Sequence, residues 1–143
     1  MNSSGTCSWV ILLLLTAGLS FGQSVNGVNL SADIPFSFTV ERAILPPGHY
    51  TVRSLGAADN KTLLIESSDK HWMKSVRTHG VYALSGPLAC RLRFTSYGEK
   101  HFLSEVWMPG SQSGYQLSKT PEAKEMERAR RADTVVIQAD RRP

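Results

Sequence analysis

Short stretches in which apolar and polar residues alternate, each bounded by glycine, proline, asparagine or serine, recur along most of this chain. In "FSFTV", residues 36–40, the three apolar side chains point one way and the two hydroxyl side chains the other, as in a half-buried strand. The alternation resumes in "HYTV" after Pro46-Pro47-Gly48, where a fixed φ angle followed by a glycine predicts a type II turn. Such a pattern favours short antiparallel strands.

Later segments repeat the pattern. "KTLLIES" and "HWMKSVRT" predict a hairpin, "THGVYALSGPL" predicts a long connection with a little strand in "VYAL", and "DTVVIQA" predicts a last strand. "CRLRFT" and "KHFLSEVW", on either side of the turn "SYGE", form the clearest hairpin. We therefore expect a mainly β chain: a single small antiparallel β-sandwich or β-barrel of about seven or eight strands with one C-terminal helix.

The second strand of the clearest hairpin carries large apolar groups on both faces. Simple alternation puts Phe102 and Val106 on one face, and Leu103 and Trp107 on the other. A strand of this kind is expected to be covered on both sides, as in the middle of a sandwich or barrel or under a packed helix.

The loop length decides which of these faces joins the apolar face of the first strand. A two- or four-residue loop would pair Phe94 with His101, whereas a three-residue loop with Gly98 in a bulge would put Phe102 and Val106 on the face of Phe94. We favour the three-residue loop because it joins two wholly apolar rows.

A helix is expected over about residues 120–132. Thr120 supplies a capping hydroxyl, Pro121 suits the first helical position, and Glu127 could pair with Arg131 one turn later. The apolar stripe of this helix is thin, so the helix either lies lightly on the surface or docks a partner through residues such as Met126 and Arg130.

The N-terminal segment predicts export. Residues 9–19 form an apolar run too short to span a bilayer as a helix, and Ser20 and Gly22 fit signal-peptidase cleavage before Gln23, although the first eight residues contain no Lys or Arg. We expect a signal peptide at 1–22, one β-rich domain at 23–139, a frayed tail at 140–143, and a periplasmic or extracellular mature protein with no stable membrane span.

Charge and cysteine content narrow the function classes. The formal charge of +4 is too small and too local for a nucleic-acid partner. Cys90 is the one cysteine left after cleavage, so no intrachain disulfide can form. Cys90 lies on the apolar face of its strand, which favours a buried, inert thiol over a nucleophile.

No catalytic or metal motif is evident. The histidines at 49, 71, 79 and 101 lack the spacing of a recognised metal site, and the chain contains neither a G-x-S-x-G elbow nor a phosphate loop. We expect no enzyme, metal or cofactor; a metal-dependent or carboxylate hydrolase is the lowest-ranked alternative.

The favoured hypothesis is a non-enzymatic binding or interaction module, whose unknown protein partner would use an exposed strand edge or the helix. The alternative is a carrier of a small apolar ligand in a cavity between sheets. The aromatic residues that would line that cavity, or simply fill the core, are Phe36, Phe38, Tyr50, Phe94, Phe102 and Trp107.

Four blocks carry a family resemblance. "IPFSFTV", "LPPGHYTV", "LLIESSD" and "YGEKHFLSEVW", in this order, resemble a family of uncharacterised exported β-rich proteins of environmental bacteria. The resemblance spans residues 28–132 and implies export and a β-rich fold, with no assigned activity or ligand. This sequence departs from the family pattern at Pro47 and in the "VVIQA" extension.

Cleavage of the signal peptide can be measured directly. We expect the protein recovered from the periplasm of an expressing cell to begin at Gln23, because small residues stand three and one positions before that bond. Intact-mass measurement and N-terminal sequencing test this, and a periplasmic product that retains residues 1–22 would contradict it.

Overall fold

The computed structural model describes residues 27–56 and 61–143, so the expected signal peptide lies outside the described residues. The elements are β1 (Asn29–Ile34), β2 (Phe38–Val40), β3 (Ala43–Leu45), β4 (Gly48–Leu55), β5 (Thr62–Ser67), β6 (Met73–Tyr82), β7 (Cys90–Tyr97), β8 (Lys100–Trp107), β9 (Ser113–Leu117), α1 (Pro121–Ala129) and β10 (Asp133–Arg141).

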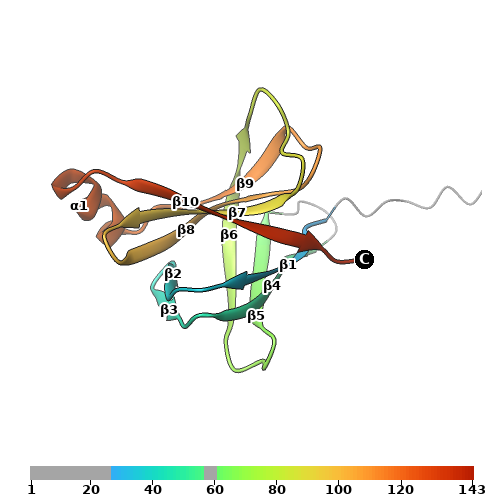
Figure 1. Cartoon of the computed structure of the whole chain (residues 1–143), viewed down its shortest axis with the longest axis horizontal. Coiled ribbons are helices and arrows are strands. Elements are labelled where there is room, and N and C mark those ends of the chain that lie inside the picture. The colour runs from blue at the N-terminus through green and yellow to red at the C-terminus, as the bar shows by residue number, and fades with distance from the viewer. Residues whose placement is uncertain (1–26, 57–60) are drawn as a thin grey trace, which may run out of the picture.

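Eight of the strands close into an antiparallel β-barrel (Figure 1). The neighbours follow the order β8, β7, β10, β1, β4, β5, β6 and β9, and pairing of β9 with β8 completes the ring. The expected mainly β fold with one helix near the C-terminus is confirmed, and of the two architectures left open the chain adopts the barrel.

The hairpin β2–β3 lies outside the ring. β2 runs parallel to the first part of β8, with Phe38 opposite His101, while the later part of β8 pairs with β9. Its two-residue turn contains Glu41 at a φ of 54°. The carboxylate of Glu41 lies 3.1 Å from the Lys74 ammonium on β6, which links this hairpin to the barrel.

The expectation of a type II turn at Pro46-Pro47-Gly48 is wrong. Gly48 begins β4 and is absent from the glycines of positive φ in the described chain, whereas a type II turn needs a positive φ at that place. Two separate features replace the expected single turn. The chain reverses at Glu41, and the two prolines only connect β3 to β4.

The length of the β7–β8 loop overturns the register that we favoured, and a β-bulge in β8 changes the register again. The β7–β8 loop has two residues, with Gly98 at a φ of 65°, and Phe94 lies opposite Leu103. The ladder then shifts between Arg93 and Phe94, leaving Ser104 as the extra residue, whose hydroxyl donates to the Arg93 carbonyl at 2.8 Å. An extra residue exchanges the two faces of a strand.

The bulge sends residues of both alternating sets into the core. Leu103 before it and Val106 after it both join the core, whereas Phe102 packs outside the barrel. Val106 therefore meets Leu92 as expected, but Phe102 does not. The expectation that this strand is covered on both faces is confirmed, since residues of both sets are buried.

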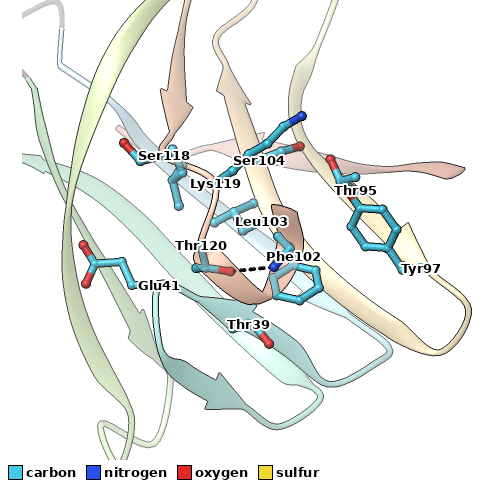
Figure 2. Close-up of a pocket in the computed structure, with 12 residues that line it drawn as sticks. Thr39, Glu41, Thr95, Tyr97, Phe102, Leu103, Ser104, Ser118, Lys119 and Thr120 are labelled. Carbon is cyan, nitrogen blue, oxygen red and sulfur yellow. Dashed lines mark hydrogen bonds between the residues drawn. The ribbon is translucent and has the colours of Figure 1, made fainter. Parts of the chain in front are cut away.

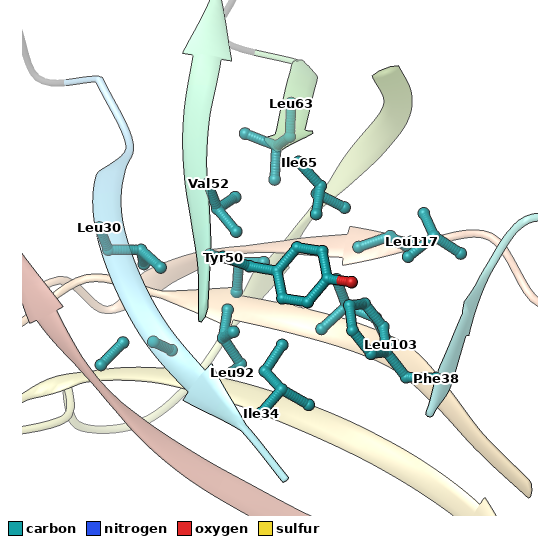
Figure 3. Close-up of a cluster of buried hydrophobic side chains, with 14 of the residues drawn as sticks. Leu30, Ile34, Phe38, Tyr50, Val52, Leu63, Ile65, Leu92, Leu103 and Leu117 are labelled. Carbon is teal, nitrogen blue, oxygen red and sulfur yellow. The ribbon is translucent and has the colours of Figure 1, made fainter. Parts of the chain in front are cut away.

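The barrel interior is filled by apolar side chains from all eight ring strands, together with side chains of β2 and β3 (Figure 3). Leu30, Val52, Ile65 and Leu92 are each at most 1% exposed. Burial of such side chains supplies the main driving force for folding, at about 25 cal/mol per Å² of apolar surface. The core alone must hold this fold, because Cys90 is a free, buried cysteine.

Three expected boundaries need correction. The little strand expected in "VYAL" is the end of β6, which continues through residues 79–82 to pair with β9 and stops before Ala83. β10 extends to Arg141, so only residues 142–143 follow it. The helix ends at Ala129, because Arg130 is already extended and three residues later β10 starts its pairing with β7. Long-range strand pairing overrides local propensity in each case.

The helix begins as expected. The Thr120 hydroxyl accepts from the Ala123 amide at 3.1 Å, and Pro121 occupies the first turn. The expected pair of Glu127 with Arg131 is wrong, because Arg131 lies beyond the helix and Glu127 contacts the Lys119 ammonium at 2.7 Å.

Gly114 on β9 allows Trp107 to lie flat against the outside of the barrel. A Cβ atom at Gly114 would stand 2.7 Å from the indole ring. We expect Gly114→Ala to lower the free energy of unfolding by about 1–3 kcal/mol, because the ring must shift. Urea denaturation measures this change.

Gly80 on β6 is the matched control for this substitution. It lies opposite Tyr115 on β9, and a Cβ atom there would meet nothing closer than 3.9 Å. Gly80→Ala should change the free energy of unfolding by less than about 1 kcal/mol. Equal losses from the two variants would contradict the close seating of Trp107.

Candidate functional site

The six aromatic residues considered as a pocket lining divide into two groups. Phe38, Tyr50 and Phe94 are 0–1% exposed in the barrel core, and the Phe38 ring meets Tyr50 and Phe94 edge-on at centroid distances of 5.0 and 5.5 Å (Figure 3). Phe36 packs at the margin of this core with its ring 5.1 Å from that of Phe94. These four side chains fill space between strands.

Phe102 and Trp107 lie outside the barrel. The register of the two-residue β7–β8 loop places Phe102 there, and the bulge after Leu103 places Trp107 there. Phe102 packs with Tyr97 beneath the helix. The Trp107 indole N–H donates to the Glu105 carboxylate at 2.7 Å, and the same carboxylate lies 3.1 Å from the Arg93 guanidinium. A single apolar pocket lined by all six aromatics is therefore not formed.

A small hollow lies under α1 (Figure 2). Its volume is about 30 Å³, close to the space that one water molecule needs. Hydroxyl and apolar side chains share the lining: Thr39, Thr95, Tyr97, Phe102, Leu103, Ser104, Leu117, Ser118, Thr120 and Ala123, with Glu41 and Lys119. It is too small for a drug-sized ligand, whose pockets span about 300–1,000 Å³.

Tyr97 lines this hollow, and its hydroxyl is the unusual group of the site. Its residue is 3% exposed, and its hydroxyl has no hydrogen-bond partner in the described part of the chain. Burial raises the pKa of Tyr97, and the Glu127 carboxylate adds to the increase. A buried hydroxyl without a partner costs stability.

The thin apolar stripe of the helix packs against the barrel. Ala123 is buried, and Met126 packs half-buried against the Tyr97–Phe102 pair. Arg130, the other residue considered for docking, is exposed, and its guanidinium lies over Gly98 in the β7–β8 turn. Met126 is thus largely used within the fold.

The four histidines are dispersed, each with its own neighbour. Their partners are Asp33 for His49, Asp69 for His71, Ser118 for His79 and Ser96 for His101. Residues 27–56 and 61–143 contain no group of three or more His, Cys, Asp or Glu arranged to hold a metal ion.

The Ser96–His101 pair is the nearest arrangement to a nucleophile with its base. The hydroxyl lies 2.6 Å from the imidazole Nδ1, and the Phe36 ring covers the imidazole at a centroid distance of 4.1 Å. In the described chain no carboxylate bonds to this imidazole, so the third member that orients the base in a hydrolase is missing. Burial also raises the pKa of the Cys90 thiol, which disfavours the nucleophilic thiolate.

An exposed apolar surface surrounds the β6–β7 connection, which we call the apolar loop (residues 83–89; Figure 1). Leu84 and Leu88 within it are 101% and 102% exposed, and Tyr82, just before it, is 82% exposed. Leu88 also lines a surface hollow with Val136 of β10, which is 44% exposed. We call Tyr82, Leu84, Leu88 and Val136 the apolar patch.

The apolar loop is held in place by the β8–β9 connection. The Ala83 amide donates to the Gln112 carbonyl at 2.9 Å, the Gln112 side-chain amide donates to the Leu84 carbonyl at 3.1 Å, and the Gly110 amide donates to the Pro87 carbonyl at 2.8 Å. A Cβ atom at Gly86 would stand 2.7 Å from the Gly110 backbone, so the two connections pack closely. The exposed leucines therefore sit on a braced support.

Comparison of the chain with protein-family models, curated proteins and solved structures gave no significant match. The resemblance to an exported β-rich family remains an expectation from the sequence. In the described part of the chain no helix is long and apolar enough to cross a membrane.

Sequence reasoning missed the apolar patch. The segment "VYALSGPL" was assigned to a connection because of its glycine and proline. The available signal was the presence of one tyrosine and two leucines in a segment expected to be a surface loop, where polar residues prevail.

Tyr97 and Tyr50 offer a matched test of the hollow under α1. The Tyr50 hydroxyl donates to the Pro46 carbonyl at 2.7 Å, whereas the Tyr97 hydroxyl has no partner among the described residues. We expect Tyr50→Phe to lower the free energy of unfolding by about 1 kcal/mol, and Tyr97→Phe to leave it unchanged or raise it. Urea denaturation of the two variants decides, and equal losses would show that the Tyr97 hydroxyl is hydrogen-bonded.

Proposed function

We propose that this chain is an exported, non-enzymatic β-barrel domain that works as an interaction module and binds a second copy of itself through the apolar patch. Export rests on the N-terminal apolar run and on the family resemblance. The interaction rests on the position of the apolar patch.

The observation that carries this proposal is the full exposure of Leu84 and Leu88 on a braced loop. Each leucine exposed to water forgoes the stabilisation that burial brings, about 1.5–3 kcal/mol. Single exposed leucines are ordinary, but a group of large apolar side chains around one connection is typical of an interface. Burial against a partner would recover that free energy.

A second copy fits this surface in size. By the areas usual for such side chains, the apolar patch offers on the order of 500 Å². A standard interface takes about 800 Å² from each partner, so the patch with its polar rim matches a small, reversible contact. In a two-fold dimer the same surface is used twice, which sets leucine against leucine.

Other functions have less support. A carrier needs a cavity, and the apolar interior is taken up by core side chains. Sheet addition needs a free strand edge, and the outermost strand of the described sheet, β3, has three residues and is followed by two prolines.

Removal of the two leucines tests the proposal. We expect the wild-type protein to form a dimer at micromolar concentrations, and Leu84→Ser/Leu88→Ser to be monomeric, because the centre of the contact is lost. Light scattering coupled to size-exclusion chromatography measures the mass in solution. A native mass spectrum distinguishes a dimer from a monomer that carries a bound ligand.

Ile44→Ser/Met73→Ser is the matched control. It removes two apolar side chains outside the apolar patch that are 68% and 58% exposed, one on β3 and one at the opposite end of β6 from Tyr82, and it should leave the dimer intact. A wild-type protein that stays monomeric at high concentration, or a dimer that both double variants disrupt equally, would contradict the proposed contact.

A further inference from the structure

The end of β10 lies beside β1 (Figure 1). A basic groove runs along the outside of the barrel at this place. It consists of two adjoining hollows of about 610 and 410 Å³, which share Asn29, Arg53 and Arg142. Lys70 lines the first hollow and Arg141 the second. β4, the β5–β6 turn and the end of β10 thus bring four cationic side chains to one groove.

These four cations are not neutralised by nearby acids. Among residues 27–56 and 61–143, no carboxylate side chain lies within 4.0 Å of Arg53, Lys70, Arg141 or Arg142, whereas four other cations have such a partner. Glu66 is the one acidic side chain in the lining, and the carboxyl group of Pro143 lies there as well. The described groove therefore carries a clear excess of positive charge.

Several contacts fix the shape of the groove and leave its cations without an acidic partner. The Arg142 guanidinium donates to the Thr51 hydroxyl at 3.1 Å, and the Arg142 amide donates to the Asn29 carbonyl at 2.9 Å. Lys70 is held in the β5–β6 turn at a φ of 59°, with its amide bonded to the Ser67 carbonyl at 2.9 Å. A fixed array of donors binds an anion better than a mobile one.

The carboxylate of Asp69, next to Lys70, already accepts hydrogen bonds from its own turn. The Asp69 carboxylate accepts from the Ser67 hydroxyl and from the His71 amide, and these hydrogen bonds hold the pKa of Asp69 below its ordinary value. Its charge is thus bonded within its own turn.

We propose that this groove binds a ligand with clustered phosphate groups. Guanidinium groups match the oxygen geometry of phosphate and can donate two hydrogen bonds to it. One phosphate cannot reach cations spread over two hollows, so a chain or cluster of phosphates suits the groove better than a single ion. The groove shares β10 with the apolar patch but is lined by different residues, and it therefore adds a second surface to the module.

Two sources could supply this chemistry: a soluble oligophosphate or the phosphates of a lipid surface. Tripolyphosphate, measured by titration calorimetry, is the soluble probe. Vesicles of phosphatidylglycerol in phosphatidylcholine, measured by co-sedimentation, are the lipid probe. Both are measured at low and at physiological salt, because exposed ion pairs weaken as salt screens them.

Arg53→Gln/Arg142→Gln tests the groove, and Arg128→Gln/Arg131→Gln is the matched control. Both double variants remove two positive charges from exposed side chains, the first in the groove and the second at the end of α1. We expect the groove variant to bind the probe at least tenfold more weakly, because each charge-assisted contact is worth about tenfold in affinity. The control should change the affinity less than about threefold.

Glu66→Gln should change the affinity for the probe in the opposite direction. A gain in affinity cannot come from misfolding, so this variant separates loss of binding from loss of folding. It removes the acidic residue that lines the groove, so the affinity should rise about two- to threefold. Binding of tripolyphosphate alone or of vesicles as well, lost in the groove variant, supports the proposal and identifies the source. Absence of binding to both probes, or an equal loss in the two double variants, would overturn it, whether or not the protein dimerises.

Discussion

The pairing of β8 with β9 closes the barrel, and most of the structure depends on it. Only Glu105 with Gln116 and Val106 with Tyr115 make this pairing. β8 reaches β9 because the bulge at Ser104 divides the strand, so that its edge faces β2 before the bulge and β9 after it. A bulge bends its strand and increases the twist, which is what ring closure requires here. Beyond it, Trp107 packs against Gly114 on the outside.

Closure also determines where binding can occur. A closed ring of eight strands has a small interior, and in this chain that interior is filled by side chains such as Tyr50 and Phe94. Binding then has to use the outside: connections between strands, the ends of strands and the helix. Both proposed contacts follow this rule, since one uses the β6–β7 connection and the other uses the end of β10 beside β1 and β4.

The sequence was informative where one residue pattern has one physical meaning. Alternation predicted most of the strands, Thr120-Pro121 predicted the helix start, and the apolar face of Cys90 predicted a buried thiol. The sequence was uninformative where the position of a residue depends on pairing with a strand that is distant in the chain. The bulge at Ser104 has no local signature, because only the pairing of Arg93 on β7 with Glu105 reveals the extra residue. The exposure of Leu84 and Leu88 was missed for a similar reason. Whether the side chains of a loop are buried depends on the segments that pack beside the loop.

The distribution of charge argues that the basic groove is more than an average surface. Beside α1 two lysines are paired with acids: Lys100 lies 2.5 Å from Glu122, and Lys119 lies 2.7 Å from Glu127. Such exposed pairs add little stability, but they keep the local field small. In the described groove Glu66 stands among four cations that come from three parts of the chain, and none of the four forms such a pair. Folding gains nothing from bringing like charges together, so their convergence has to be explained by something outside the fold, and an anionic ligand supplies that explanation.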